Sequence, residues 1–169
     1  APTGSYHPLT LASLFFLFSI LGWILETLSY LTMEGVFLNR SILLGPWIPL
    51  YGICGVLSVT MLHRFAKNPI LAFCMNGLLY SVIGYLSDFT VQMIWHADLH
   101  KISQYFCPSL LPPFFADAMF LGLIGCACQY FIAPKWKQIT RKIPLWFLLC
   151  VCVLLGMLML LDVFFAFYR

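Results

Sequence analysis

The sequence has 169 residues, of which 62% are hydrophobic and only 9% are charged, and its mean hydropathy is +0.94. Soluble domains carry about 45–50% apolar and about 25% charged residues, so a soluble domain, a disordered chain and a secreted disulfide scaffold are all excluded. The net charge of +3 comes without a basic face interleaved with aromatic residues, so no nucleic-acid partner is indicated. The composition predicts a small polytopic membrane protein.

Five segments of the chain are apolar enough to be transmembrane helices, each of which needs about 20 residues to cross the hydrocarbon core. The second segment is the shortest, although mostly apolar residues precede it. We therefore expect one all-α membrane domain over residues 1–169, a helix bundle with about five spans at Leu9–Met33, Trp47–Leu62, Pro69–Trp95, Phe114–Ala133 and Pro144–Tyr168.

A broken segment is expected before the second span. Two prolines and two glycines fall within Gly45–Gly52, and this disfavours a continuous helix. The stretch is too apolar for a water-exposed loop, and non-helical backbone at membrane depth is tolerated only where it is buried in protein or lines a cavity. We predict a partly re-entrant segment that carries Arg40. This cation either snorkels to lipid headgroups, pairs with Glu26 or Asp88, or binds an anionic ligand group.

Four carboxylates lie within the predicted spans, where a charged side chain costs about 2.5–3.5 kcal/mol on insertion scales. Glu26 and Asp88 each lie about 10 Å below the same membrane face, at a rise of 1.5 Å per residue, and Asp117 lies about 6 Å below it. Asp162 is near that face. All four acids thus belong to one half of the membrane, and we expect an acidic cavity there.

Stripes of small or polar residues run along three of the spans and are typical of helix packing seams. These seams would turn Glu26 and Asp88 inward, away from lipid. The stripes are Ser19, Gly22, Glu26 and Ser29 in the first span, Gly77, Ser81, Gly84 and Asp88 in the third, and Ala118, Gly122, Gly125 and Gln129 in the fourth.

The loop before the fourth span contains His96, Asp98 and His100, which could hold a metal if the loop were helical. Because no Cys or Glu nearby completes the ligand set, we expect a titratable loop at the mouth of the cavity instead. Six of the seven cysteines lie within predicted spans and no CxxC occurs, so we predict no metal site and no cofactor. The GxxxxGK[ST] motif and the common hydrolase and dinucleotide motifs are absent, so the chain is not itself an ATPase and has no recognised catalytic motif.

The distribution of Lys and Arg predicts the orientation of the chain. The loops at 61–68 and 134–143 hold six of these residues on the N-terminal side, against Arg40, Lys101 and Arg169 on the other side. The positive-inside rule then places the N-terminus in the cytoplasm and the C-terminus outside.

The stretch FFLFSILGWILETL, followed by FLNRSILLGPWIPLYGICG, resembles the bacterial CmpB-type family labelled "putative ABC-transporter type IV". That family shows GWxxE and then NRGxLxGPxxPIYG, and Ser41 replaces its usual second-motif Gly. Ser87-Asp88-Phe89 is also similar to the family, whereas its WDYS and NxxGRICL elements are not intact here. The matched motif positions are Gly22, Trp23, Glu26, Asn39, Arg40, Leu43, Gly45, Pro46, Pro49, Tyr51 and Gly52.

The resemblance implies a permease of the bacterial inner membrane that works with an ATPase or another membrane subunit, and an oligomer is compatible with it. Three functions stay open. A transport component would use its cavity for a small polar or cationic solute. An intramembrane enzyme would use buried carboxylates as acid or base on a lipid or isoprenoid. A structural or assembly subunit would use Glu26, Arg40 and Asp88 as a buried ionic lock.

We prefer transport, because acids beside a broken membrane segment are typical of solute sites. Membrane lipids surround such a protein in any case. The expected cavity residues are Glu26, Asn39, Arg40, Asp88, Asp117, Trp23 and Tyr51, with His96, Asp98 and His100 at its mouth.

Overall fold

A computed structural model describes residues 6–35, 45–95 and 113–168, and every regular element in these ranges is helical. The prediction of an all-α fold is confirmed. Side chains at 29, 30, 33, 34, 87–95, 113–118 and 167–168 are not described. The chain divides into two compact units: the central unit, residues 57–132, and the split unit, residues 4–56 together with 133–169.

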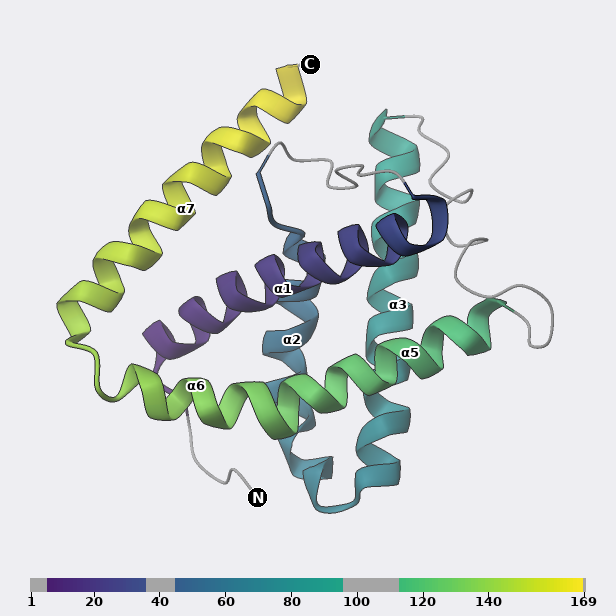
Figure 1. Cartoon of the computed structure of the whole chain (residues 1–169), viewed down its shortest axis with the longest axis horizontal. Coiled ribbons are helices and arrows are strands. Elements are labelled where there is room, and N and C mark those ends of the chain that lie inside the picture. Colours follow the sequence, from purple (N-terminus) through teal and green to yellow (C-terminus); the bar gives the residue numbers. More distant parts are fainter. Residues whose placement is uncertain (1–5, 36–44, 96–112, 169) are drawn as a thin grey trace. The chain divides into compact units, whose positions relative to one another are not determined.

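The split unit contains α1 (Pro8–Glu34), the first part of α2 (Pro49–Met61), α6 (Ala133–Thr140) and α7 (Leu145–Tyr168). Helix α1 begins with Pro8, whose missing N–H costs nothing in the first turn. It ends at Gly35, whose φ of +67° favours glycine and whose N–H bonds to the Leu31 carbonyl at 3.1 Å. In this unit α1 packs against α6 and α7 (Figure 1).

The central unit contains the end of α2, the 3₁₀-helix η1 (Leu62–Lys67), α3 (Pro69–Trp95), α5 (Pro113–Ala127) and the π-helix η2 (Cys128–Ile132). Helices α3 and α5 cross and form the main contact of the unit (Figure 1). Gly122 and Gly125 of α5 lie in this contact. A Cβ at Gly122 would be 2.9 Å from the Phe73 carbonyl oxygen, and one at Gly125 would be 2.7 Å from Asn76 Cβ.

The predicted small-residue seam of α5 is therefore confirmed, because its glycines let the two backbones approach closely. On α3 the seam runs along a different line of residues. Phe73 and Asn76 meet α5, whereas a Cβ at Gly84 would meet no atom within 4 Å. Spacing alone marks a face of small residues, but it does not say which part of that face has a partner.

We predict that Gly122→Ala destabilises the protein, because the new methyl would press on the Phe73 backbone carbonyl, which cannot move aside cheaply. The matched control is Gly84→Ala. It should be neutral or stabilising by up to about 1 kcal/mol, since Ala is the better helix former and the space is open. Thermal unfolding of both variants in the same detergent measures the difference. A Gly122→Ala protein as stable as the Gly84→Ala protein would contradict this packing.

A network of buried polar side chains crosses the central unit. Ser58 Oγ donates to Asn76 Oδ1 at 2.5 Å, and Asn76 Nδ2 donates to Gln129 Oε1 at 3.1 Å. Gln129 Nε2 in turn donates to the Leu62 carbonyl at 3.0 Å. All three side chains are at most 1% exposed. Buried amides that bond across helices add specificity to helix packing, because their alternative partners in hydrocarbon are few.

The segment 134–143, expected as a loop, is largely the helix α6. Pro134 lies at its second residue, directly after the π-turn η2. A proline inside an α-helix removes one hydrogen bond and collides with the carbonyl four residues earlier, here that of Tyr130. The wider π-turn places this carbonyl differently, so the helix continues past Pro134 instead of ending there.

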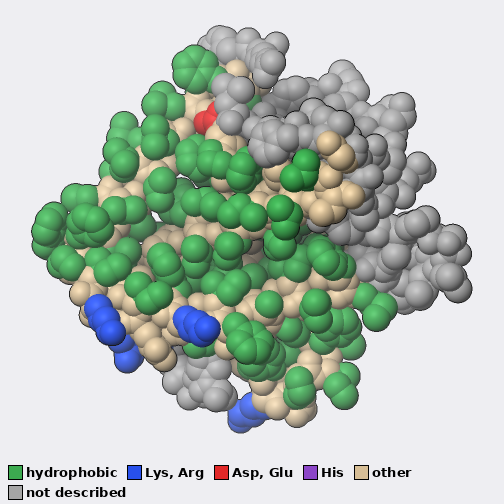
Figure 2. Space-filling model, viewed as in Figure 1, with side chains coloured by type: hydrophobic (Ala, Val, Ile, Leu, Met, Phe, Trp, Pro, Cys, Tyr) green, Lys and Arg blue, Asp and Glu red, His purple; other side chains and the backbone are tan. Residues whose placement is uncertain are grey.

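Three described helical stretches are long and apolar enough to cross a membrane: Pro8–Leu28, Pro69–Leu86 and Leu145–Ala166. Protein covers little of the last one, where Trp146 and Leu160 are 70% and 68% exposed. Hydrophobic side chains also cover most of the described surface in Figure 2. Helix α2, with 13 residues, rises only about 20 Å. The count of five spans stays a prediction.

Candidate functional site

The predicted break before the second span is present in the described part of the second motif, which starts at Gly45. Residues 45–48 are not helical, and α2 starts at Pro49. The backbone N–H of Ile48 bonds to the Ser19 carbonyl of α1 at 3.0 Å. This backbone N–H, which the break leaves outside a helix, therefore has an acceptor on the neighbouring helix. The preceding residues, including Asn39 and Arg40, and the expected re-entrant path lie outside the described residues.

Glu26 and Tyr51, two of the predicted site residues, form a hydrogen bond. The Tyr51 hydroxyl donates to Glu26 Oε1 at 2.7 Å. The glycine one turn before Glu26 makes this geometry feasible, since a Cβ at Gly22 would lie 2.6 Å from Tyr51 Cδ2. The tyrosine ring therefore rests on the bare backbone of α1 and its hydroxyl reaches the carboxylate. Trp23, on the same turn of α1, is half-buried.

The close approach continues along α2. A Cβ at Gly52 would lie 2.7 Å from the Phe15 carbonyl oxygen and would also collide with Ser19 Oγ. The first-span stripe of Ser19, Gly22 and Glu26 thus faces the motif residues Tyr51 and Gly52, which confirms this part of the seam. A side chain at Gly22 or Gly52 would collide with the facing helix, so glycine at both positions lets α2 pack closely against α1.

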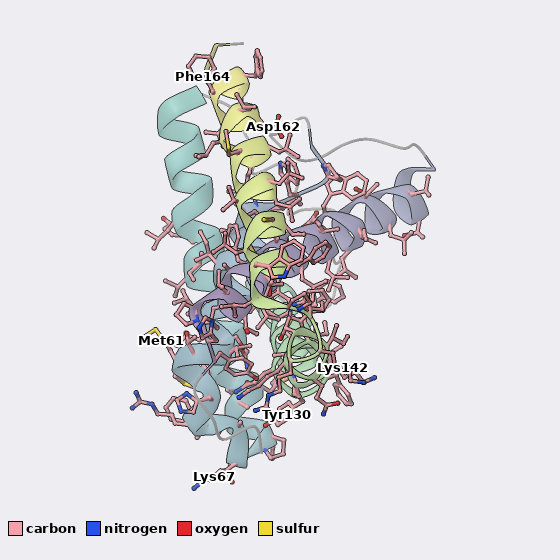
Figure 3. All side chains as sticks on the ribbon, turned by 90° about the vertical axis from the view of Figure 1, so that its left-hand side faces the viewer. Met61, Lys67, Tyr130, Lys142, Asp162 and Phe164 are labelled. Atoms are coloured by element: carbon pink, nitrogen blue, oxygen red, sulfur yellow. The ribbon has the colours of Figure 1, made fainter. Side chains whose placement is uncertain are left out.

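Asp162 provides a second carboxylate and contacts the same segment. It is buried on α7, and its Oδ2 accepts from the Gly45 N–H at 2.8 Å and from the Trp47 indole N–H at 2.9 Å. It lies near the C-terminal end of α7 (Figure 3). Sequence reasoning placed Asp162 in the acidic half of the membrane but did not choose it as a site residue. The available signal was an acid that interrupts an otherwise uncharged span.

The described structure does not test the other predicted site residues. Asp88 lies on α3 and Asp117 on α5, both in the central unit, and their side chains are not described. His96, Asp98 and His100 lie outside the described residues, as do Asn39 and Arg40. The candidate site of the split unit consists of Glu26, Tyr51, Asp162 and the segment Gly45–Trp47, hereafter the motif cluster.

The chemistry of the motif cluster follows from its donors. The Tyr51 hydroxyl, the Gly45 amide and the Trp47 indole are uncharged donors, and each orients a carboxylate oxygen of Glu26 or Asp162. Carboxylates are the side chains that pair with cations in proteins. One short stretch, residues 45–51, carries donors for both acids and links their positions.

The chain is similar over residues 13–167 to the family described as "Putative ABC-transporter type IV". No curated protein and no solved structure matches the chain.

Proposed function

The chain belongs to the CmpB-type family, "putative ABC-transporter type IV", over nearly its whole length, and from this premise we propose that it binds a small cationic solute at the motif cluster. The family and the apolar helices fit a membrane transport component. The finer proposal is supported chiefly by one observation, the hydrogen bond from Tyr51 to Glu26.

Glu26 is the proposed ligand-binding carboxylate. It lies on α1, within Pro8–Leu28, which is apolar enough to cross a membrane. A carboxylate there costs several kcal/mol and is retained most readily where a ligand or a partner uses its charge. Tyr51 holds this carboxylate in one orientation, and its own position depends on the broken segment that leads into α2. A shift of that segment would therefore change the binding geometry, which is what a transport cycle requires.

Thermal stabilisation by defined cations tests the proposal. Protein in nanodiscs is heated with tetramethylammonium, choline, guanidinium or putrescine, and with glucose and sulfate as uncharged and anionic comparisons. A thiol-reactive dye reports unfolding through the buried free cysteines Cys54, Cys128 and Cys152. A cation at 100 times its Kd adds about 2.7 kcal/mol to the free energy of unfolding, so we expect at least one cation to raise the Tm by several degrees.

Substitutions locate the binding site. Glu26→Gln should abolish the Tm increase, and Tyr51→Phe should weaken binding about tenfold, since a hydrogen bond to a charged group contributes about 1.5–3 kcal/mol. Glu34→Gln is the matched control, because it makes the same chemical change at the last residue of α1, about 12 Å along the helix. Equal stabilisation of the Glu26→Gln protein, or no stabilisation by any cation, would refute the proposal.

A structural role is the second candidate, and Asp162 favours it. Its carboxylate fixes two residues of the broken segment and could serve assembly without binding a solute. The two functions are separable, because a purely structural cluster predicts that Asp162 variants are unstable while no cation stabilises the unmodified protein.

The proposed location is the inner membrane of a bacterium, with a cytoplasmic N-terminus and with an ATPase or another membrane subunit as partner. The positive-inside rule supports this orientation. In the split unit, Lys142 precedes α7 while Asp162 lies near its other end (Figure 3). A cysteine introduced at Arg141 lies just before the N-terminal end of α7. If that end of α7 is cytoplasmic, an impermeant maleimide added to intact cells should not label this cysteine.

A further inference from the structure

A basic surface precedes α7 and has no role in the proposed solute site. It consists of Lys135, Arg141 and Lys142, all exposed, on α6 and the turn after it. Lys and Arg side chains gather in this region at the lower left of Figure 2. The sequence has no Asp or Glu between Ala118 and Leu161, so no acid from the same stretch of chain neutralises them.

Helix α6 has one anchored side and one open side. Ala133 and Thr140 are buried, and the Trp136 indole N–H donates to Ser13 Oγ at 2.9 Å. On the open side, Lys135 and Ile139 lie four residues apart and are both exposed. Residues spaced by three, four and seven share a helix face, so the bonds of the anchored side hold the open side in a fixed direction.

The turn after α6 is also ordered by hydrogen bonds. The Arg141 N–H bonds to the Lys137 carbonyl at 3.3 Å, and the Lys142 N–H bonds to the Ile139 carbonyl at 3.0 Å. Lys137 itself is engaged elsewhere, with Nζ 4.5 Å from the centre of the Tyr6 ring. Burial raises the pKa of the Tyr6 phenol, so this ring stays neutral at physiological pH and holds Lys137 through its π face.

Compensation of the α6 dipole accounts for only some of these charges. A cation near the C-terminus of a helix is favourable, and Arg141 and Lys142 have that position. Lys135 lies five residues before Thr140, the last residue of α6, and the effect of the dipole falls off within the last turn. The dipole therefore leaves the charge of Lys135 without an explanation.

The aromatic and apolar residues that follow indicate which partner these basic residues have. Leu145, Trp146 and Phe147 open α7 and are 59%, 70% and 49% exposed. They begin the stretch Leu145–Ala166, which is long and apolar enough to cross a membrane. An exposed tryptophan between a basic segment and an apolar span is typical of the headgroup level of a bilayer. A soluble acidic protein would match the charges but not the apolar side chains beside them.

We propose that Lys135, Arg141 and Lys142 bind the phosphate groups of anionic phospholipids, with Trp146 at the headgroup boundary. The surface selects anionic lipid from the surrounding bilayer and fixes the depth of α7. A basic residue near an anionic membrane surface strengthens binding roughly fivefold, and three of them make the preference measurable even when salt weakens each one.

Quenching of tryptophan fluorescence by brominated lipids tests the proposal in the full-length protein. Vesicles of dioleoylphosphatidylcholine contain the same mole fraction of either brominated phosphatidylglycerol or brominated phosphatidylcholine. The contribution of Trp146 is the difference between the unmodified protein and Trp146→Phe. We expect brominated phosphatidylglycerol to occupy this site about tenfold more readily than brominated phosphatidylcholine, and 1 M salt should reduce that preference.

Three variants show which charges are responsible. Lys135→Gln/Arg141→Gln/Lys142→Gln should reduce the preference to within about twofold. Lys135→Arg/Lys142→Arg should retain it, which excludes a folding defect as the cause. Arg64→Gln/Lys67→Gln removes two exposed charges of the central unit and should also retain it.

Equal quenching by the two brominated lipids in the unmodified protein would overturn the proposal. So would a preference that persists in the triple variant. If the lipids quench equally and the triple variant also loses a co-purifying ATPase, the basic surface binds a protein and the lipid assignment is wrong.

Discussion

Asp162→Ala is expected to lower the free energy of unfolding by about 3 kcal/mol. The substitution removes an acceptor of both the Gly45 N–H and the Trp47 indole N–H, and a buried donor that loses its acceptor costs about 1–3 kcal/mol. Asp162→Asn should cost less, because its amide oxygen can still accept from at least one of these donors. The effect should also be local, since both donors lie in the broken segment.

Equilibrium unfolding of purified protein in mixed micelles with increasing SDS measures the cost. Leu161→Ala is the matched control, because Leu161 is the preceding residue of α7 and is 53% exposed. Its stability should change by about 0.5 kcal/mol or less. Hydrogen exchange of the Gly45 amide provides a second readout and should accelerate in Asp162→Ala. If the Ala and Asn variants are both as stable as the Leu161→Ala protein, Asp162 does not hold this segment.

Asn76→Ala and Gln129→Ala are each expected to destabilise the central unit by about 2 kcal/mol. Either change breaks the bond between the two amides, and each leaves a buried polar group without its partner. The two residues should also be coupled, so the double variant should lose less stability than the two single variants together. Measured hydrogen bonds between membrane helices predict a coupling of about 0.6–1.7 kcal/mol.

A double-mutant cycle by SDS unfolding checks the coupling. Cys74→Ala, an exposed position on the same helix, controls for substitution within α3 and should be nearly neutral. Strictly additive effects of Asn76→Ala and Gln129→Ala would show that the two amides stabilise the protein independently, contrary to the network.

The sequence predicts the parts of this structure that depend on periodicity or on special residues. The apolar spans, the break near Pro46 and Pro49, and the seam through Gly122 and Gly125 all have local causes. The proximity of Glu26 to Tyr51 could also be expected from the sequence, because both residues belong to motifs that were assigned to one site. The expected membrane depth of each acid rests on the helical rise and stays a prediction.

Contacts between distant segments were not predictable in this way. Nothing near Asp162 in the sequence indicates that it would bond to Gly45 and Trp47, more than a hundred residues earlier. Asn76 was overlooked because a single amide in an apolar span produces no pattern, and Gln129 was noticed only as the end of a small-residue stripe. The π-turn before Pro134 was missed because a proline ordinarily indicates the end of a helix.

Infrared difference spectroscopy of the Glu26 carboxylate tests the central claim most directly. Glu26 and Glu34 are the two glutamates of the sequence, so a Glu34→Gln protein labelled with ¹³C-glutamate reports on Glu26 alone. Protein in nanodiscs is titrated with the cation that gives the greatest thermal stabilisation. We predict that the labelled carboxylate band shifts and saturates with the thermal binding curve. A labelled band that does not move while the cation stabilises the protein would place the binding elsewhere and contradict the assignment of Glu26.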